Sequence, residues 1–334
     1  MTAAAILGCL GPRLRPEERA FFAETKPWGF ILFARNLETP DQIRRLTAAL
    51  RDAVGYDAPI LIDQEGGRVQ RIGPPHWRQW LPPLDQMALG GRDALRAMWL
   101  RARIIADELH ALGIDVNCSP TCDIADDDTH AFLRNRCYGS DAATVTAAAR
   151  AVADGLLAGG VLPVAKHTPG HGRAFVDSHR DLPVVGADTA ALQSQDFAPF
   201  RALADLPMAM TAHIVYSALD ARAPATTSAK VVGLIRDAIG FEGLLMTDDI
   251  SMQALAGDLA ARSRASIAAG CDVVLHCNGE MDEMQAVVGA CGALTGAAAD
   301  RAQAALAARR APVAFDVAAA EAELAELLDG RVYG

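Results

Sequence analysis

Three of the chain's eight histidines lie within the fourteen residues 166–179, which read KHTPGHGRAFVDSH. A lysine, an aspartate, a proline and two glycines stand among them. Because the proline and glycines interrupt regular helix and regular strand, these imidazoles are expected on a loop. Three kinds of chemistry fit such a loop: metal binding, phosphate binding, and proton transfer by an acid or base.

Metal and phosphate binding are the less favoured alternatives. His167 and His171 are four residues apart, but the proline and glycine between them exclude a helical turn that would place both imidazoles on one face. The acidic stretch ADDDTH at 125–130 is typical of a solvated loop. A phosphate cradle places its glycines at a helix N-terminus, whereas PGHG at 169–172 leads into further loop. We therefore expect neither a metal nor a cofactor.

Proton transfer is the chemistry that the rest of the segment favours. Asp177 and His179 are two residues apart, so they share a face if the chain is extended there. A carboxylate on one imidazole nitrogen fixes the tautomer and leaves the other nitrogen to exchange a proton with substrate. The pair still needs a nucleophile, and Asp248 at the end of GLLMTDD (243–249) is available. This set is typical of a two-step displacement by a carboxylate, with imidazole as acid and then base.

Short apolar runs, rich in Val, Ile and Leu, recur along the chain without apolar–polar alternation, as expected of strands covered on both faces. The predicted strands lie at 3–8, 29–34, 59–63, 114–120, 161–167, 208–213, 243–249 and 272–277. Helical patterns follow them at 16–24, 40–54, 92–111, 141–158, 187–203, 228–238, 255–269 and 280–290, with two more near 297–311 and 316–329. Thr39 and Ser140 are expected to cap the second and fourth of these helices.

Eight strand–helix units in series predict an α/β protein with a single (β/α)8 barrel of the TIM type. We expect one catalytic domain over residues 1–334, with about 297–334 as helices that cover the barrel. A doubly wound open sheet is the alternative, but no G-x-G-x-x-G fingerprint follows any predicted strand.

The polar residues at the ends of the predicted strands indicate where the site lies. Catalytic groups of a TIM barrel sit at the carboxyl ends of its strands. The residues that interrupt apolar runs at this point are Asp63, Lys166, His167, His213, Asp248 and Asp249. Because each buried charge needs compensation, so many on one rim favour a functional site over a satisfied core. The roles of His213 and Asp249 stay open.

Composition limits the classes of partner. The net charge of −10 and the lack of any basic block argue against a nucleic-acid partner. No run approaches the ~20 apolar residues of a membrane span. The seven cysteines fall mostly in apolar runs, as expected of buried free thiols in a reducing compartment. We therefore expect a cytoplasmic protein that binds neither a nucleic acid nor a membrane. The sequence does not indicate an oligomeric state.

Three spaced motifs resemble one enzyme family. KHTPGHG and DSH of the opening segment, together with IDQEGGRVQR (62–71) and TDDISM (247–252), resemble glycoside hydrolase family 3. The resemblance runs from about residue 5 to about 295, and it is to the bacterial β-N-acetylglucosaminidases of peptidoglycan recycling. It implies a retaining glycosidase on a (β/α)8 barrel, without a cofactor. It also implies the reaction, release of N-acetylglucosamine (GlcNAc) from 1,6-anhydromuramoyl peptides.

The resemblance further assigns roles to single residues. It implies that Asp248 is the nucleophile and that Asp177 and His179 form the acid/base dyad. The residues that it implies for holding the non-reducing sugar are Asp63, Arg71, Arg136 (in RNRCYG), Lys166 and His167.

Three other functions remain open at this point. In substrate-assisted hydrolysis the acetamide of the sugar attacks, and the pair Asp248–Asp249 would orient it. In a β-N-acetylglucosaminide phosphorylase, a neutral histidine base tolerates an incoming phosphate better than a carboxylate would. A non-catalytic amino-sugar sensor is the alternative from a different class, and the complete nucleophile and dyad set argues against it.

Overall fold

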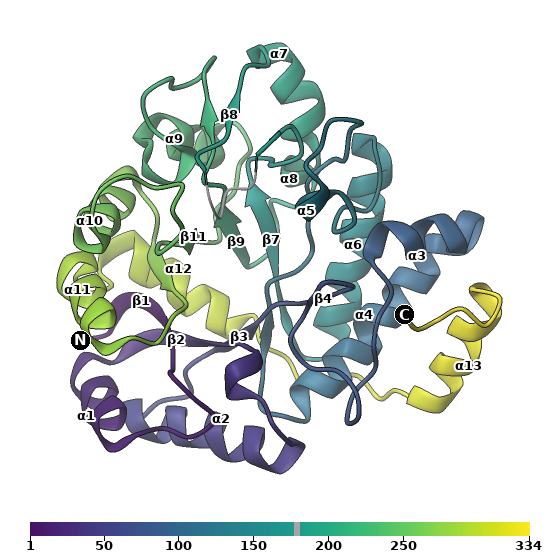
Figure 1. The fold of residues 1–334 in the computed structure, drawn as a ribbon, viewed down its shortest axis with the longest axis horizontal. Helices are drawn as coiled ribbons and strands as arrows, with labels where there is room; N and C mark the ends of the chain where they lie inside the picture. The colour runs from purple at the N-terminus through teal and green to yellow at the C-terminus, as the bar shows by residue number, and fades with distance from the viewer. Residues whose placement is uncertain (177–180) are drawn as a thin grey trace.

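The structure is a computed structural model that describes residues 1–176 and 181–334. Its centre is a closed barrel of parallel strands, around which the outer helices are arranged (Figure 1). In chain order the barrel strands are β1 (Ala3–Gly8), β2 (Pro27–Leu32), β3 (Ile60–Ile62), β6 (Val116–Asn117), β7 (Leu162–Thr168), β9 (Met208–Thr211), β11 (Leu244–Asp249) and β12 (Val273–His276). β1 pairs with both β2 and β12 and so closes the barrel. The predicted fold class is confirmed.

The strands are apolar on both faces because both faces are covered. Every residue of β1, β2 and β7 is buried, which explains why these runs do not alternate. Side chains such as Ile31, Leu61 and Val164 form one cluster inside the barrel, and a larger cluster lies between the strands and the outer helices. β3 and β6 are shorter than predicted. At the end of β6, the Asn117 side chain accepts a hydrogen bond from the Gln64 N–H and donates one to the Gln64 carbonyl.

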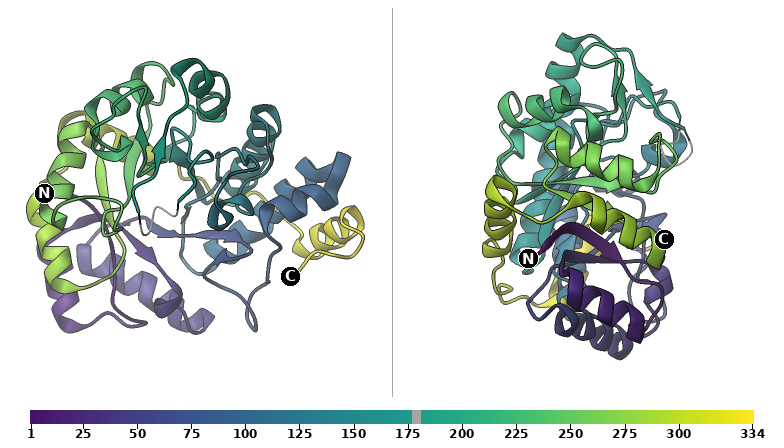
Figure 2. Two further views of the ribbon diagram at one scale, coloured as in Figure 1. Left: turned by 45° about the horizontal axis from the view of Figure 1, so that its top comes forward. Right: turned by 90° about the vertical axis from the view of Figure 1, so that its left-hand side faces the viewer.

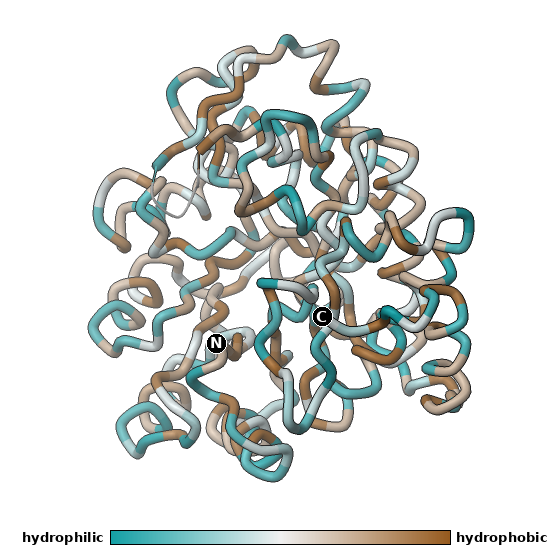
Figure 3. The backbone as a smooth tube through the Cα atoms, turned by 45° about the vertical axis from the view of Figure 1, so that its right-hand side comes forward, coloured by the Kyte–Doolittle hydropathy of each residue, from teal (hydrophilic) through white to brown (hydrophobic). Residues whose placement is uncertain are grey.

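Except for α8, which covers only the end of the helix predicted at 187–203, the outer helices lie close to the predicted ranges. They are α1 (Pro16–Thr25), α2 (Pro40–Val54), α4 (Ala94–His110), α6 (Ala142–Ala158), α8 (Ala198–Ala202), α9 (Ala229–Asp237), α10 (Leu259–Ala269) and α11 (Met281–Cys291). Hydrophilic and hydrophobic residues alternate along them in Figure 3, as expected of helices with one buried face. The Thr39 side chain caps α2, as predicted. The predicted cap of α6 was wrong by one residue: Asp141, and not Ser140, accepts from the Thr144 N–H.

Several short elements were not predicted. Next to the barrel rim, a hairpin is formed by β4 (Gln64–Gly66) and β5 (Val69–Gln70). The other additions are α3 (Pro83–Gly90), α5 (Ala131–Arg134), and the paired strands β8 (Val184–Val185) and β10 (Val215–Tyr216). The helix predicted at 187–203 is divided into α7 (Thr189–Ala191), a π-helix at Leu192–Asp196, and α8. Apart from α3, which has eight residues, the unpredicted elements are segments of two to four residues, too short to give a periodic pattern.

Two helices follow the last barrel unit. α12 (Gly296–Ala307) contributes Ala302 and Ala305 to the apolar cluster inside the barrel, so it covers the amino ends of the strands. α13 (Val317–Leu327) lies against α4 on the outside of the barrel, as Figure 1 and the left view of Figure 2 show. An exposed ion pair between Arg96 and Glu323 joins these two helices. Within the described residues, no helix is long and apolar enough to span a membrane.

Candidate active site

A cavity of about 460 Å³ opens at the carboxyl ends of the barrel strands. Its walls come from the residues that end or follow β2, β3, β7, β11 and β12. The predicted site residues that line it are Asp63, Arg71, Arg136, Lys166, His167 and Asp248. Six of the eight predicted side chains, from distant parts of the sequence, therefore meet around one cavity.

Asp63, directly after β3, joins two of the predicted cations. Its Oδ1 is 2.8 Å from Lys166 Nζ, and its Oδ2 accepts a hydrogen bond of 3.1 Å from Arg71 Nη2. Burial alone would raise the pKa of Asp63, but the adjacent Lys166 and Arg71 charges hold that pKa well below its usual value. Asp63 is therefore an ionised hydrogen-bond acceptor at the edge of the cavity.

Glu65, on the unpredicted hairpin, is a second buried acceptor. Its carboxylate receives two hydrogen bonds of 2.8 Å from Arg136, through Nε and Nη2, and lies 2.5 Å from Lys166 Nζ. Burial would raise the pKa of Glu65, but Arg136 and Lys166 lower it to about 2. The bidentate pair fixes the plane of the Arg136 guanidinium, because both nitrogens must face one carboxylate. Two residues after Asp63 in IDQEGGR, Glu65 was visible in the sequence but not singled out.

His167 is held between a carboxylate and a guanidinium. Its Nδ1 is 2.7 Å from Asp123 Oδ2, and its Nε2 is 3.4 Å from Arg136 Nη2. Asp123 is fully buried and was not predicted as part of the site. His171 also lines the cavity, and burial, followed by the neighbouring His167, lowers its pKa to about 4. A neutral His171 fits its buried position.

Asp248 and Asp249 end β11 and have different surroundings. Asp248 lines the cavity, and its Oδ1 accepts a hydrogen bond of 2.8 Å from the Asp249 N–H. The Asp249 carboxylate accepts hydrogen bonds from the Ser251 hydroxyl at 2.7 Å and from the Cys277 N–H at 3.3 Å. Asp249 also touches the cavity, but these bonds tie it to the neighbouring loops. The arrangement favours Asp248 over Asp249 as a nucleophile.

His213, whose role the sequence left open, lies behind the cavity wall. Its Nδ1 is 2.7 Å from the Thr226 hydroxyl, and its Nε2 is 3.0 Å from the Asp249 carbonyl. Burial lowers the pKa of His213. With both ring nitrogens in contact with protein oxygens, His213 supports the end of β11 and does not face the cavity.

The predicted dyad residues Asp177 and His179 lie outside the described residues. Their assignment as acid/base therefore stays a prediction. The chain leading to them is described as far as Val176, and it leaves β7 directly after His167 and Thr168.

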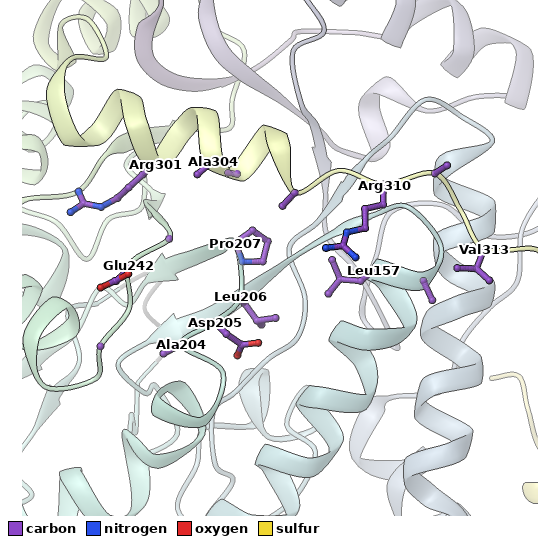
Figure 4. A pocket seen from close by; sticks show the side chains of 16 residues that line it. Leu157, Ala204, Asp205, Leu206, Pro207, Glu242, Arg301, Ala304, Arg310 and Val313 are labelled. Atoms are coloured by element: carbon purple, nitrogen blue, oxygen red, sulfur yellow. The ribbon is translucent and has the colours of Figure 1, made fainter.

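A larger cavity, of about 790 Å³, lies at the opposite end of the barrel (Figure 4). Leu206, Pro207 and Gly243 line it just before β9 and β11, and α12 forms its far wall. Its lining is mostly alanine, leucine and proline, and Arg301 there already pairs with Asp272. Groups at this end of a TIM barrel ordinarily serve stability. The smaller, polar cavity is therefore the candidate active site.

The described part of the chain has no evident metal-binding site. Within residues 1–176 and 181–334, no group of three or more His, Cys, Asp or Glu side chains is arranged to hold an ion. The cavity instead combines a partly exposed carboxylate with fixed hydrogen-bonding groups. Chemically, this arrangement can hold a polyhydroxylated ligand and present Asp248 to it.

The comparisons with known proteins agree on one family. The N-terminal domain of glycosyl hydrolase family 3 matches residues 5–308. A β-hexosaminidase of Methylococcus capsulatus is 38% identical over 274 residues, which cover 80% of this chain and 81% of the relative. A β-hexosaminidase of Bordetella parapertussis is 37% identical over 276 residues, covering 80% of this chain and 78% of the relative.

Solved structures show the same fold. NagZ from Neisseria gonorrhoeae, in complex with N-trifluoroacetyl-D-glucosamine, superimposes with a TM-score of 0.86 at 31% identity, over 98% of each chain. A family 3 β-N-acetylglucosaminidase from Paenibacillus sp. superimposes with a TM-score of 0.85 at 28% identity, over 98% of this chain and 66% of that one.

Proposed function

The chain belongs to glycosyl hydrolase family 3, and from this premise we propose that it removes non-reducing GlcNAc from peptidoglycan fragments through a covalent glycosyl–aspartate intermediate. It is a β-N-acetylhexosaminidase, the activity that its relatives carry in their names. The observation that supports the proposed reaction is the cavity that Asp248 lines together with Asp63, Arg71, Arg136, Lys166 and His167.

In the proposed mechanism, the sugar is held by fixed hydrogen-bonding groups while Asp248 attacks its anomeric carbon. Asp63 and Lys166 form an ion pair at the rim that can accept from and donate to sugar hydroxyls. His179, oriented by Asp177, would protonate the leaving oxygen and then deprotonate the water that releases the sugar. The neutral form of an imidazole base also suits an incoming anion, which keeps a phosphorylase as the second candidate.

The charge of the cavity wall supports an anionic leaving group such as a muramoyl peptide. The basic lining residues are Arg35, Arg68, Arg71, Arg136 and Lys166, against three acidic ones, Asp63, Asp248 and Asp249. The chain as a whole carries −10, so this local excess of cations offsets long-range repulsion of an acidic substrate. Arg35 donates to the Cys9 and Cys277 carbonyls, and the Arg68 guanidinium lies 5.7 Å from the centre of the Phe132 ring. In the described part of the chain neither pairs with a carboxylate, so we propose that their charges act on the leaving group.

A cytoplasmic location is part of the proposal. All seven cysteines are buried and unpaired, which matches a protein that works in a reducing compartment. The fragments that we propose as substrates are small molecules. Neither a nucleic acid nor a membrane is required for the reaction.

One product analysis tests the reaction. Proton NMR of a GlcNAc β-glycoside digest should show β-GlcNAc as the first-formed sugar, because two displacements at one carbon retain the configuration. The retaining geometry places the two catalytic groups of a carboxyl pair about 5–5.5 Å apart, without room for an intervening water. Initial α-GlcNAc would contradict the assignment. Addition of phosphate should leave the product unchanged, and the appearance of GlcNAc 1-phosphate would favour the phosphorylase.

We expect Arg71→Ala to weaken the use of GlcNAc glycosides while the fold stays intact. Arg71 hydrogen-bonds Asp63, and its guanidinium lies 5.0 Å from the centre of the Phe33 ring. Arg71→Ala therefore removes one charged contact to the sugar and also the hydrogen bond that helps to hold Asp63. Charge-assisted hydrogen bonds contribute roughly 1.5–3 kcal/mol, so kcat/KM should fall roughly 10- to 100-fold. Arg44→Ala removes an exposed arginine of α2 and is the control. An unchanged kcat/KM in Arg71→Ala, with a normal melting curve, would remove Arg71 from the site.

A further inference from the structure

Asp123 is a buried carboxylate that contacts the predicted sugar-binding residue His167 and does not itself line the cavity. It is fully buried, and its two oxygens have different partners. Oδ2 lies 2.7 Å from His167 Nδ1, whereas Oδ1 accepts a hydrogen bond of 2.7 Å from the His171 N–H. The His167 N–H is 3.3 Å from both oxygens. Both oxygens of Asp123 therefore accept hydrogen bonds, and all of these bonds come from His167 and His171.

The other side of the His167 ring shows which nitrogen carries the proton. His167 Nε2 is 3.4 Å from Arg136 Nη2, and a guanidinium has only donors. For a neutral ring, Nε2 is therefore the acceptor in this contact, and the ring proton is on Nδ1, toward Asp123. Arg136 cannot turn away easily, because Glu65 holds it through two hydrogen bonds. An imidazolium at His167 would set an N–H against the guanidinium.

We propose that Asp123 is a positioning residue that fixes His167 as the neutral tautomer protonated at Nδ1. The single lone pair of Nε2, which makes only a long contact of 3.4 Å with Arg136, can then accept from a hydroxyl of the bound sugar in place of that contact. The inference rests on the proposed function in one respect, namely that His167 contacts the sugar. Asp123 acts on the substrate only through His167. The same carboxylate anchors the His171 N–H, so it also fixes the start of the chain that leaves β7.

An asparagine at this position cannot replace the carboxylate, although the two side chains have nearly the same shape. If its amide oxygen accepts from His167 Nδ1, its NH₂ group faces the His171 N–H, donor against donor. If the amide is flipped, the NH₂ group donates to Nδ1, and the ring proton moves to Nε2, where it opposes Arg136. Either arrangement disturbs the acceptor that we propose for the sugar.

The test combines the tautomer with the kinetics. In protein labelled with ¹⁵N-histidine, the ¹⁵N shifts of His167 should show a protonated Nδ1 and an unprotonated Nε2 at neutral pH, assigned by their absence from His167→Gln. Asp123→Asn should change this pattern. It should also lower kcat/KM for a GlcNAc glycoside by about 10- to 100-fold, the loss typical when the carboxylate partner of a metal-binding histidine is removed.

Asp272→Asn is the matched control. Asp272 is also buried and also accepts from a backbone N–H, that of Leu245, but it lies at the opposite end of the barrel and pairs with Arg236 and Arg301. This variant should lose stability without any change in kcat/KM or in the His167 signals. A comparable loss of kcat/KM in both variants would show a merely structural role for Asp123.

The inference and the proposed function fail in different ways. If wild-type His167 carries its proton on Nε2, or on both nitrogens, the inference is overturned even though turnover is normal. A folded Asp123→Asn with unchanged kcat/KM would overturn it as well. If Asp123→Asn does not fold, the wild-type tautomer still decides. If the wild-type protein releases no GlcNAc from any glycoside, the proposed function fails, whatever the tautomer.

Discussion

Asp248→Ala should lose hydrolysis of every GlcNAc glycoside, whatever its leaving group, by a factor on the order of 10⁴ or more. The reason is that each substrate must pass through the same attack on the anomeric carbon. Asp248 ends β11 and lines the polar cavity, and its Oδ1 is held by the Asp249 N–H. Single-turnover rates on an aryl glycoside and on a disaccharide should therefore fall by similar factors.

The control for this variant is Asp258→Ala. Asp258 belongs to the loop between β11 and α10, where its side chain caps α10 by accepting from the Ala261 N–H. Its loss should cost about 1 kcal/mol of stability and leave activity nearly unchanged. A folded Asp248→Ala that retains most of its rate on either substrate would show that another group attacks the sugar.

His179→Ala should slow the reaction of a disaccharide and that of a nitrophenyl glycoside to different extents. General acid catalysis contributes on the order of 10²- to 10⁴-fold, and a sugar alcohol needs the proton to leave. A nitrophenyl group departs readily without it. The variant should therefore lose much more of its single-turnover rate on a disaccharide than on a nitrophenyl glycoside. Asp177→Ala should show the same pattern in milder form, because the imidazole is present but badly oriented.

His110→Ala, which removes an exposed histidine at the end of α4, serves as the control and should behave like the wild-type protein on both substrates. Equal losses from His179→Ala on the disaccharide and the aryl glycoside would mean that this histidine is not the acid. Because His179 lies outside the described residues, these rates are the direct evidence for its role.

Much of the barrel could be predicted because its strands carry a strong local pattern. Runs that are buried on both faces, such as β1 and β7, show continuous apolar residues, and β7 ends in polar residues at the rim. That pattern gave the fold and brought Asp63, Lys166 and Asp248 to one end of the barrel. The hairpin β4–β5 has strands of two and three residues, too short for any periodic pattern.

The carboxylates that hold the site together could not be predicted in the same way. Glu65 contacts Arg136, 71 residues later, and Asp123 contacts His167, 44 residues later. Neither partner can be identified from spacing, because the contacts arise only when the barrel closes. Arg136, which matches the family pattern only loosely in RNRCYG, is nonetheless fixed in the cavity wall by its bond to Glu65.

The central claim, direct attack by Asp248, is tested most directly by trapping. A fluorinated N-acetylglucosaminide with a good leaving group forms a glycosyl–enzyme that breaks down slowly. Mass spectrometry of the digested protein should then find one added sugar on the peptide that contains Asp248. Substrate-assisted attack by the acetamide, or direct phosphorolysis, would leave that peptide unmodified. Turnover of the substrate without any adduct on Asp248 would contradict the account.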